Sequence, residues 1–174
     1  VFVINKMDTA TPEGIATVKA NIAKINPKAT VIEGNSPLTV EHPEFIEGKK
    51  VLVVEDGPTL THGEMKYGAG IVAAKQNKAA SIIDPRPYAV GSIKDTFEKY
   101  NHLDDLLPAM GYGDKQMKEL EETINATPCD AVIIGTPIDL GRLLKINKPS
   151  TRVTYKLEER QGSAQLSAEL GKIK

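Results

Sequence analysis

Hydroxyl, basic and glycine residues are concentrated between Thr59 and Gly70, directly after the apolar β-branched run Val51–Val54. That run is typical of a strand buried on both faces, and Ile71-Val72-Ala73 predicts a helix after the loop. A strand, a small-residue loop and a helix in this order present backbone N–H groups to an anion. We therefore predict a phosphate or carboxylate site, with these residues as its donors: Thr59, Thr61, His62, Gly63 and Lys66. The alternative is that the glycines serve only tight turns and close packing.

A second group with binding chemistry is Asn5-Lys6-Met7-Asp8, which follows the apolar run Val1–Ile4. It is similar to the N-K-x-D element with which P-loop GTPases recognise guanine. An aspartate carboxylate can accept two hydrogen bonds from the base, a lysine stem can cover the flat ring, and an asparagine can tie loops together. Ser36 lies one predicted helix and one predicted strand later, where such folds place a second base-contacting loop. The alternative is a plain loop before a capped helix.

Strands and helices alternate along the chain. We predict strands at Val1–Ile4, Thr30–Glu33, Val51–Val54, Ala80–Ile83 and Ala131–Ile134, and an edge strand at Arg152–Leu157. Helices are predicted at Pro12–Ile25, Ile93–Tyr100, Gln116–Asn125 and Leu140–Leu144. This order indicates an α/β fold with a mainly parallel sheet flanked by helices, in a Rossmann-like or P-loop-type three-layer arrangement. Ligands of such sheets bind beyond the carboxyl ends of the strands, where the candidate loops are expected to gather.

Composition limits the function classes. The chain has 174 residues, a formal net charge of -1 and 40% hydrophobic residues. It has no basic excess that would indicate nucleic-acid binding, and no apolar run long enough to span a membrane. Its one cysteine, Cys129, excludes an intramolecular disulfide, and we interpret it as a buried structural thiol. A cytoplasmic location is expected. Because Val1 already lies in a predicted strand, we also expect the chain to be a fragment of a longer protein.

Longer runs of the sequence resemble one microbial family. They are VLVVEDGPTLTHGEMKYGAG, DPRPYAVGSIKDTFEKY, LPAMGYG, LEETIN and IGTPIDLGRLLKINKPSTRVTYKLEE. They look like the C-terminal part of the predicted GTPases related to cyclic 2,3-diphosphoglycerate synthetase. The resemblance covers residues 1–159, interpreted as the C-terminal part of a P-loop NTPase-like α/β domain. Residues 160–174 are predicted to form a terminal helix or a flexible tail. The resemblance implies that the phosphate loop and the Mg²⁺-binding residues precede Val1.

The resemblance also implies a reaction, the ATP-dependent closure of 2,3-bisphosphoglycerate to its cyclic anhydride. Phosphoryl transfer of this kind needs cations around crowded phosphates. We predict that the catalytic cations are His62, Lys66, Arg86 and Arg142, and that Thr136, Asp139 and Lys145 bind phosphate together with the loop donors. Each has a structural alternative: His62 as a helix cap, Lys66 and Lys145 as solvated side chains, Arg86 as a brace of its loop, and Arg142 as a partner of Asp139.

The N-K-x-D element favours guanine, whereas the synthetase of the resembling family uses ATP. Three hypotheses therefore stay open for the chain. The first is a nucleotide-dependent phosphoryl-transfer enzyme that uses ATP or GTP with Mg²⁺ and a small phosphorylated metabolite. The second is a GTP-hydrolysing switch or accessory protein. The third is a substrate-cap or assembly segment without turnover of its own. A homo-oligomer is compatible with each, and no nucleic-acid or membrane partner is expected.

Overall fold

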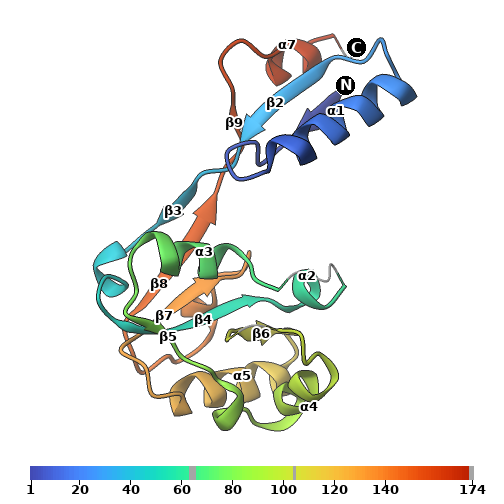
Figure 1. The fold of residues 1–174 in the computed structure, drawn as a ribbon. Coiled ribbons are helices and arrows are strands. Elements are labelled where there is room, and N and C mark those ends of the chain that lie inside the picture. The colour runs from blue at the N-terminus through green and yellow to red at the C-terminus, as the bar shows by residue number, and fades with distance from the viewer. Residues whose placement is uncertain (63–65, 104, 173–174) are drawn as a thin grey trace. The chain divides into compact units, whose positions relative to one another are not determined.

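The computed structural model describes residues 1–62, 66–103 and 105–172, and of His62 only the backbone. The chain forms two compact units (Figure 1). Unit 1 comprises Val1–Leu38 and Tyr155–Lys174, and unit 2 comprises Thr39–Thr154. The prediction of a single domain over residues 1–159, followed by a separate tail, stays a prediction.

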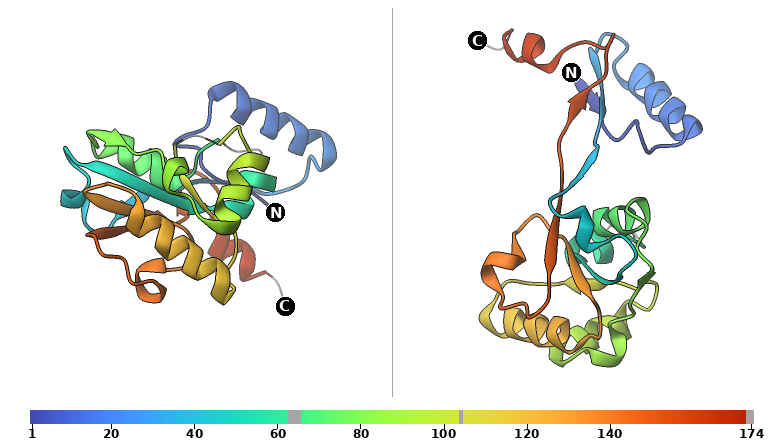
Figure 2. Two further views of the ribbon diagram at one scale, coloured as in Figure 1. Left: turned by 90° about the horizontal axis from the view of Figure 1, so that it is seen from below. Right: turned by 90° about the vertical axis from the view of Figure 1, so that its left-hand side faces the viewer.

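Unit 1 is a small sheet with a helix on either side (Figures 1 and 2). Its elements are β1 (Phe2–Ile4), α1 (Pro12–Ile25), β2 (Val31–Asn35), β9 (Glu158–Glu159) and α7 (Leu166–Leu170). β1 pairs with β2 in parallel, and β9 pairs with the other edge of β2 in antiparallel orientation. Ile22 of α1 forms the core of this unit together with Ile4 and Met7.

The start of α1 follows directly from the sequence. Thr11 lies in an extended conformation, and its Oγ1 accepts a hydrogen bond from Gly14 N at 3.1 Å. Pro12 occupies the first helical position, where its missing N–H has no intrahelical partner to lose. The helix therefore begins and ends at the residues that its pattern predicts, Pro12 and Ile25.

Unit 2 contains a larger, mainly parallel sheet. Its strands are β3 (Leu38–Val40), β4 (Lys50–Asp56), β5 (Ser81–Ile82), β6 (Leu107–Ala109), β7 (Ala131–Gly135) and β8 (Ser150–Tyr155). Its helices are η1 (Pro43–Phe45), α2 (Gly57–His62), α3 (Ala69–Gln76), η2 (Arg86–Tyr88), α4 (Gly91–Lys99), α5 (Asp114–Ala126) and α6 (Leu140–Leu143). The strand order is β3-β8-β7-β4-β5, and β6 also pairs with β4. The α/β class predicted from the sequence is thus confirmed.

β4 is the central strand, and Val51–Val54 are completely buried. One edge of β4 pairs with β7 over Val51–Glu55. Its other edge is shared by two short strands, with β5 beside Lys50 and Val51 and β6 beside Val54, Glu55 and Asp56. All these pairs are parallel, so the carboxyl ends of β4, β6 and β7 meet at the same edge of the sheet.

Helices cover both faces of this sheet (Figure 1). α3 lies on one face, and α4 and α5 lie together on the other. A Cβ atom added at Gly70 of α3 would lie 2.7 Å from Val53 Cγ1, so glycine allows this helix to approach β4 closely. Among the described residues, no helix is long and apolar enough to cross a membrane.

The structure corrects several element predictions. No element was predicted between Tyr100 and Gln116, yet Leu107–Ala109 form β6, whose central residue Pro108 is buried. Proline fits there because β6 is a short strand at the end of the β4 edge. β3 was not predicted. β8, predicted as an edge strand at Arg152–Leu157, lies inside the sheet between β3 and β7.

Two further corrections concern the predicted loop after β4 and the start of α5. Half of the loop residues Thr59–Gly70 belong to helices, because α2 ends at His62 and α3 begins at Ala69. α5, predicted at Gln116–Asn125, begins at Asp114 and ends at Ala126, and Gly113 precedes the helix in extended conformation.

Candidate functional site

The predicted base-recognition residues lie together in unit 1. Met7 N donates a hydrogen bond to Gly34 O at 3.0 Å, which joins the loop after β1 to the end of β2. Ser36 N donates to Asp8 Oδ1 at 3.1 Å. The two loops that the sequence separates by one helix and one strand are therefore neighbours at the carboxyl ends of parallel strands.

The first two residues of the N-K-x-D element shape its backbone. Asn5 Oδ1 accepts a hydrogen bond from Lys6 N at 2.8 Å, and Lys6 has a φ of 60°. A positive φ is uncommon for a residue other than glycine, so the turn holds Lys6 in a specific conformation. Both side chains are exposed. This arrangement leaves the lysine stem accessible for contact with a flat ligand.

Two buried polar atoms beside Asp8 lack a partner. Ser36 is only 7% exposed, and neither its Oγ nor Asn35 Oδ1 has a hydrogen-bond partner among the described residues. Buried polar groups are ordinarily paired, so these two atoms have hydrogen-bonding capacity that the described residues do not use. Asn35, which directly precedes Ser36, was not among the predicted site residues.

The predicted hydroxyl donors at the end of β4 are occupied within the fold. Asp56 Oδ2 accepts hydrogen bonds from Thr59 N at 3.3 Å and Thr59 Oγ1 at 2.5 Å. The buried Thr61 Oγ1 donates to Gly57 O at 3.0 Å. Both threonines thus stabilise α2. Gly63 and the side chain of His62 lie outside the described residues, and Lys66 is exposed.

The anion that binds at the start of α3 is the chain's own Glu55. Its Oε1 accepts a hydrogen bond from Ile71 N at 3.0 Å, and the N–H groups of Gly68 and Gly70 also interact with the carboxylate. The sequence analysis expected an external phosphate or carboxylate at this strand-loop-helix unit. The signal for Glu55 was present, because it is an acidic residue that directly continues the buried run Val51–Val54.

Burial raises the pKa of Glu55 to about 7, against the lowering effect of three backbone hydrogen bonds. The negative charge of Asp56 adds a smaller increase. Burial, followed by the charge of the same Asp56, also raises the pKa of Tyr112, which follows β6. The charge of Asp56 therefore acts both on Glu55 of β4 and on Tyr112 after β6, and the ends of β4 and β6 converge at this edge.

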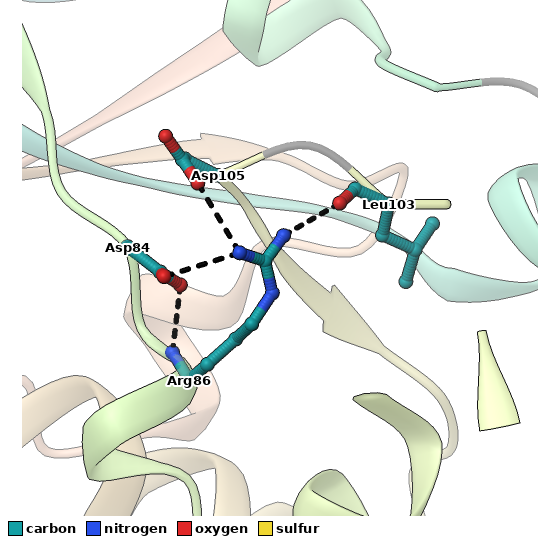
Figure 3. Close-up of polar contacts among 4 residues, drawn as sticks. All are labelled: Asp84, Arg86, Leu103 and Asp105. Atoms are coloured by element: carbon teal, nitrogen blue, oxygen red, sulfur yellow. Dashed lines mark hydrogen bonds and ion pairs between the residues drawn. The ribbon is translucent and has the colours of Figure 1, made fainter. Parts of the chain in front are cut away.

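Arg86 joins two loop segments that lie beside strands β5 and β6 (Figure 3). Its Nη1 contacts Asp84 Oδ2 at 3.1 Å and Asp105 Oδ1 at 3.4 Å, and its Nη2 donates to Leu103 O at 2.6 Å. The guanidinium thus joins the segment after β5 to the segment before β6, in the seam where these strands share one edge of β4. This geometry supports the structural alternative given above for Arg86.

The loop after β7 holds a second charged group. Arg142 Nε contacts Asp139 Oδ2 at 3.1 Å, and Arg152 of β8 approaches the same oxygen at 4.0 Å. Arg152 Nη2 also donates to Pro137 O at 2.7 Å. The Arg142 side chain is 86% exposed, so its pairing with Asp139 leaves it open to solvent. Arg152 was not singled out in the sequence analysis.

The remaining predicted phosphate ligands are Thr136 and Lys145. Thr136 is buried, and its Oγ1 donates to Ile138 O at 2.6 Å, which fixes the turn after β7. The exposed Lys145 is held through its backbone, because its N–H donates to Glu121 Oε2 at 2.6 Å and its carbonyl accepts from Asn125 Nδ2.

The loops that carry Asp8, His62, Arg86 and Thr136 were expected to gather at the carboxyl edge of one sheet, but these residues belong to two different units. Asp8 belongs to unit 1 and the other three to unit 2. Within unit 2, α2 and Thr136 follow the carboxyl ends of β4 and β7, whereas Arg86 lies in the seam between β5 and β6. In the described ranges, no three His, Cys, Asp or Glu residues form a group that could hold a metal ion.

Comparison with known proteins gives one close relative. Over 159 residues, or 91% of the chain, the sequence is 65% identical to arginine synthetase ArcE from Thermococcus kodakarensis. The chain spans 36% of the length of that relative. No family model matches the chain, so the resemblance to the cyclic 2,3-diphosphoglycerate synthetase family lacks support at the level of a family match. The chain is therefore similar to a segment of a protein named as a synthetase.

Proposed function

We propose that this chain is a segment of a nucleotide-dependent synthetase that forms arginine. The observation that carries the proposal is the 65% identity with arginine synthetase ArcE over 91% of the chain. Identity at this level over both units supports the same fold and the same set of loops. Because the chain spans only 36% of the relative, the proposal concerns a longer protein in which this segment takes part.

The chemistry of such a synthetase overlaps with the reaction that the sequence resemblance implies. To form a guanidinium, a nitrogen nucleophile must displace an oxygen from carbon. Transfer of a phosphoryl group from a nucleoside triphosphate to that oxygen makes it a leaving group, and ammonia then forms the C–N bond as phosphate departs. Phosphoryl transfer is common to arginine formation and to closure of 2,3-bisphosphoglycerate, and the acceptor distinguishes them. The name of the relative favours the amino-acid product.

The loops around Asp8 support the nucleotide part of the proposal. Asp8 Oδ1 accepts the Ser36 N–H, and in the part of the chain that the structure describes, Ser36 Oγ and Asn35 Oδ1 of the same loop pair have no hydrogen-bond partner. A carboxylate next to hydrogen-bonding hydroxyl and amide oxygens suits a base edge that carries N–H donors. The nucleotide would bring Mg²⁺ with it to balance the charge of its phosphates, and the described residues supply no ligand cluster for the ion.

The proposal can be tested with a segment-swapped relative, defined as the Thermococcus protein whose matching 159-residue segment is replaced by that of this chain. Purified protein is incubated with Mg²⁺, ammonium, the ureido analogue of arginine and either ATP or GTP. Arginine should form with one of the nucleotides and not without it. The Thermococcus protein lacking the segment is the negative control. Absence of arginine from a folded segment-swapped protein, when the parent is active, would contradict the proposal.

The same protein distinguishes the alternatives. Nucleotide hydrolysis without arginine would favour a switch or accessory protein, and a cyclic product from 2,3-bisphosphoglycerate, detected by phosphorus NMR, would favour the anhydride-forming reaction. The base site is tested with Asp8→Ala. We expect this variant to lose preference between ATP and GTP, while Asp95→Ala, which changes an exposed aspartate of α4, keeps it.

A further inference from the structure

Glu55 is an acidic residue at an unusual position. It occupies the carboxyl end of the central strand β4, is only 2% exposed, and accepts a hydrogen bond from Ile71 N at 3.0 Å. The residue that precedes α3, Gly68, has no side chain that could cap the helix. The carboxylate of Glu55 therefore takes the place of an N-cap side chain, although it lies 16 residues away from Ile71 in the sequence.

Three glycines make room for this carboxylate. A Cβ atom added at Gly68 would lie 2.5 Å from Glu55 Oε2, one at Gly70 3.1 Å from Oε1, and one at Gly135 2.6 Å from Oε2. Any side chain at Gly68 or Gly135 would therefore force the carboxylate or the backbone to move. These glycines come from the segment before α3, from α3 itself and from the end of β7, so three parts of the chain close around one side chain.

The carboxylate also fixes one end of the segment that begins with α2. The start of that segment packs closely on β6, because a Cβ atom at Gly57 would lie 2.6 Å from Ala109 O. Asp56 caps the same helix through Thr59. Glu55 holds the other end through Gly68 and Ile71. The described parts of the segment are thus anchored on both sides of the carboxyl edge of β4.

We propose that Glu55 is a positioning residue of the synthetase, whose carboxyl group clamps the start of α3 to β4 and β7 and so fixes the backbone that follows the central strand. The functional part of this statement rests on the proposed function, whereas the clamp itself does not. Glu55 is buried and acts through the backbone of its neighbours, so it is distinct from the predicted catalytic cations, whose side chains were expected to reach phosphate directly.

The clamp responds to protonation. Burial raises the pKa of Glu55 to about 7, and Asp56 is the charged neighbour that contributes to this rise. The groups that donate hydrogen bonds to the carboxylate are backbone N–H groups of Gly68, Gly70 and Ile71, and none of these residues carries a titratable side chain. Burial disfavours the carboxylate more than the three backbone hydrogen bonds favour it. Opening that exposes Glu55 to solvent is therefore easier when Glu55 is ionised than when it is neutral.

Hydrogen exchange of the Gly70 and Ile71 amide protons, measured by NMR on the 174-residue chain, tests the clamp. After correction for intrinsic exchange, protection in the wild type should fall about tenfold or more between pH 5 and 8, since each pKa unit corresponds to tenfold in the opening equilibrium. Glu55→Gln keeps an acceptor oxygen without a charge and should be protected at both pH values. Glu55→Asp has a shorter side chain and should lose protection at both.

An exposed glutamate of α5 provides the matched control, and Glu122→Gln should behave as the wild type does. Equal protection in the wild type, Glu55→Gln and Glu55→Asp at both pH values would overturn the clamp.

In an active segment-swapped relative, Glu55→Asp should lower kcat about tenfold or more, while Glu55→Gln should retain kcat and remove its pH step near 7. An unchanged kcat in Glu55→Asp would overturn the positioning role. Absence of arginine formation would contradict the proposed function, and the clamp would then be tested by the hydrogen-exchange result alone.

Discussion

The free energy of unfolding should depend on pH through Glu55, and the sign follows from the direction of its pKa shift. The pKa is raised from 4.5 to about 7 in the folded chain. Between these values the folded carboxyl binds more protons than the unfolded one, so stability falls as pH rises. The stabilisation linked to this group is fully present below pH 4.5 and is lost as pH passes through about 7.

The magnitude comes from the size of the shift. The pKa rises by the difference between about 7 and 4.5, and one pKa unit corresponds to about 1.4 kcal/mol, so the group changes the unfolding free energy by about 3 kcal/mol at most. Glutamine resembles the neutral carboxyl and does not titrate. Glu55→Gln should therefore equal the wild type at pH 5 and exceed it at pH 8, despite the loss of a native side chain.

Urea denaturation followed by circular dichroism measures this difference. Wild type, Glu55→Gln and Glu122→Gln are unfolded at pH 5 and at pH 8, and the change in unfolding free energy between the two pH values is compared. Other titrating groups contribute equally to the three proteins and cancel in the comparison. If Glu55→Gln loses the same stability between pH 5 and 8 as the wild type does, the assignment of a buried, proton-holding carboxyl to Glu55 is wrong.

Three further substitutions test the local geometry by urea denaturation at one pH. Thr11→Ala removes the N-cap of α1 and should lower the free energy of unfolding by about 1 kcal/mol. The control Thr9→Ala, which changes a residue of the preceding loop, should lower it by less. Equal effects of the two substitutions would argue against the cap. Arg86→Ala removes the contacts between the segment after β5 and the segment before β6 and should lower the free energy of unfolding by about 1–3 kcal/mol. Arg86→Lys should restore only part of this loss. An unchanged free energy of unfolding in Arg86→Ala would contradict the brace. Arg142→Ala removes an exposed ion pair and should change stability by less than about 0.5 kcal/mol, so a large loss would show that Asp139 depends on this partner.

The order of elements was predictable because apolar periodicity and helix signals are local. Thr11-Pro12 and the spacing of isoleucine and valine define α1 without reference to the rest of the chain. The completely buried run Val51–Val54 identifies the central strand for the same reason. Where the elements depend on distant partners, the sequence was less informative. β6 contains a proline, β3 is a strand chiefly because it pairs with β8, and the position of β8 inside the sheet depends on its pairing with β3 and β7.

The candidate site, too, was predictable from the sequence only in part. The proximity of Asp8 and Ser36 could be predicted, because parallel strands place their carboxyl ends side by side. The role of Thr61 could not be predicted, since its partner Gly57 O is a backbone group that carries no sequence signal. A brace was one alternative for Arg86, but the sequence did not indicate its partner Leu103 O. A strand-loop-helix unit also does not reveal which anion occupies the helix start, and here the anion is the side chain of Glu55.

The central claim, that the chain belongs to a nucleotide-dependent arginine-forming synthetase, is tested most directly by stoichiometry in the segment-swapped relative. Arginine and free phosphate are measured over time with the preferred nucleotide, Mg²⁺, ammonium and the ureido acceptor. We expect the two products to appear in equal amounts, because each C–N bond releases one phosphate from the activated carbon. Release of phosphate with no arginine, by a folded protein whose Thermococcus parent forms arginine under the same conditions, would contradict the account.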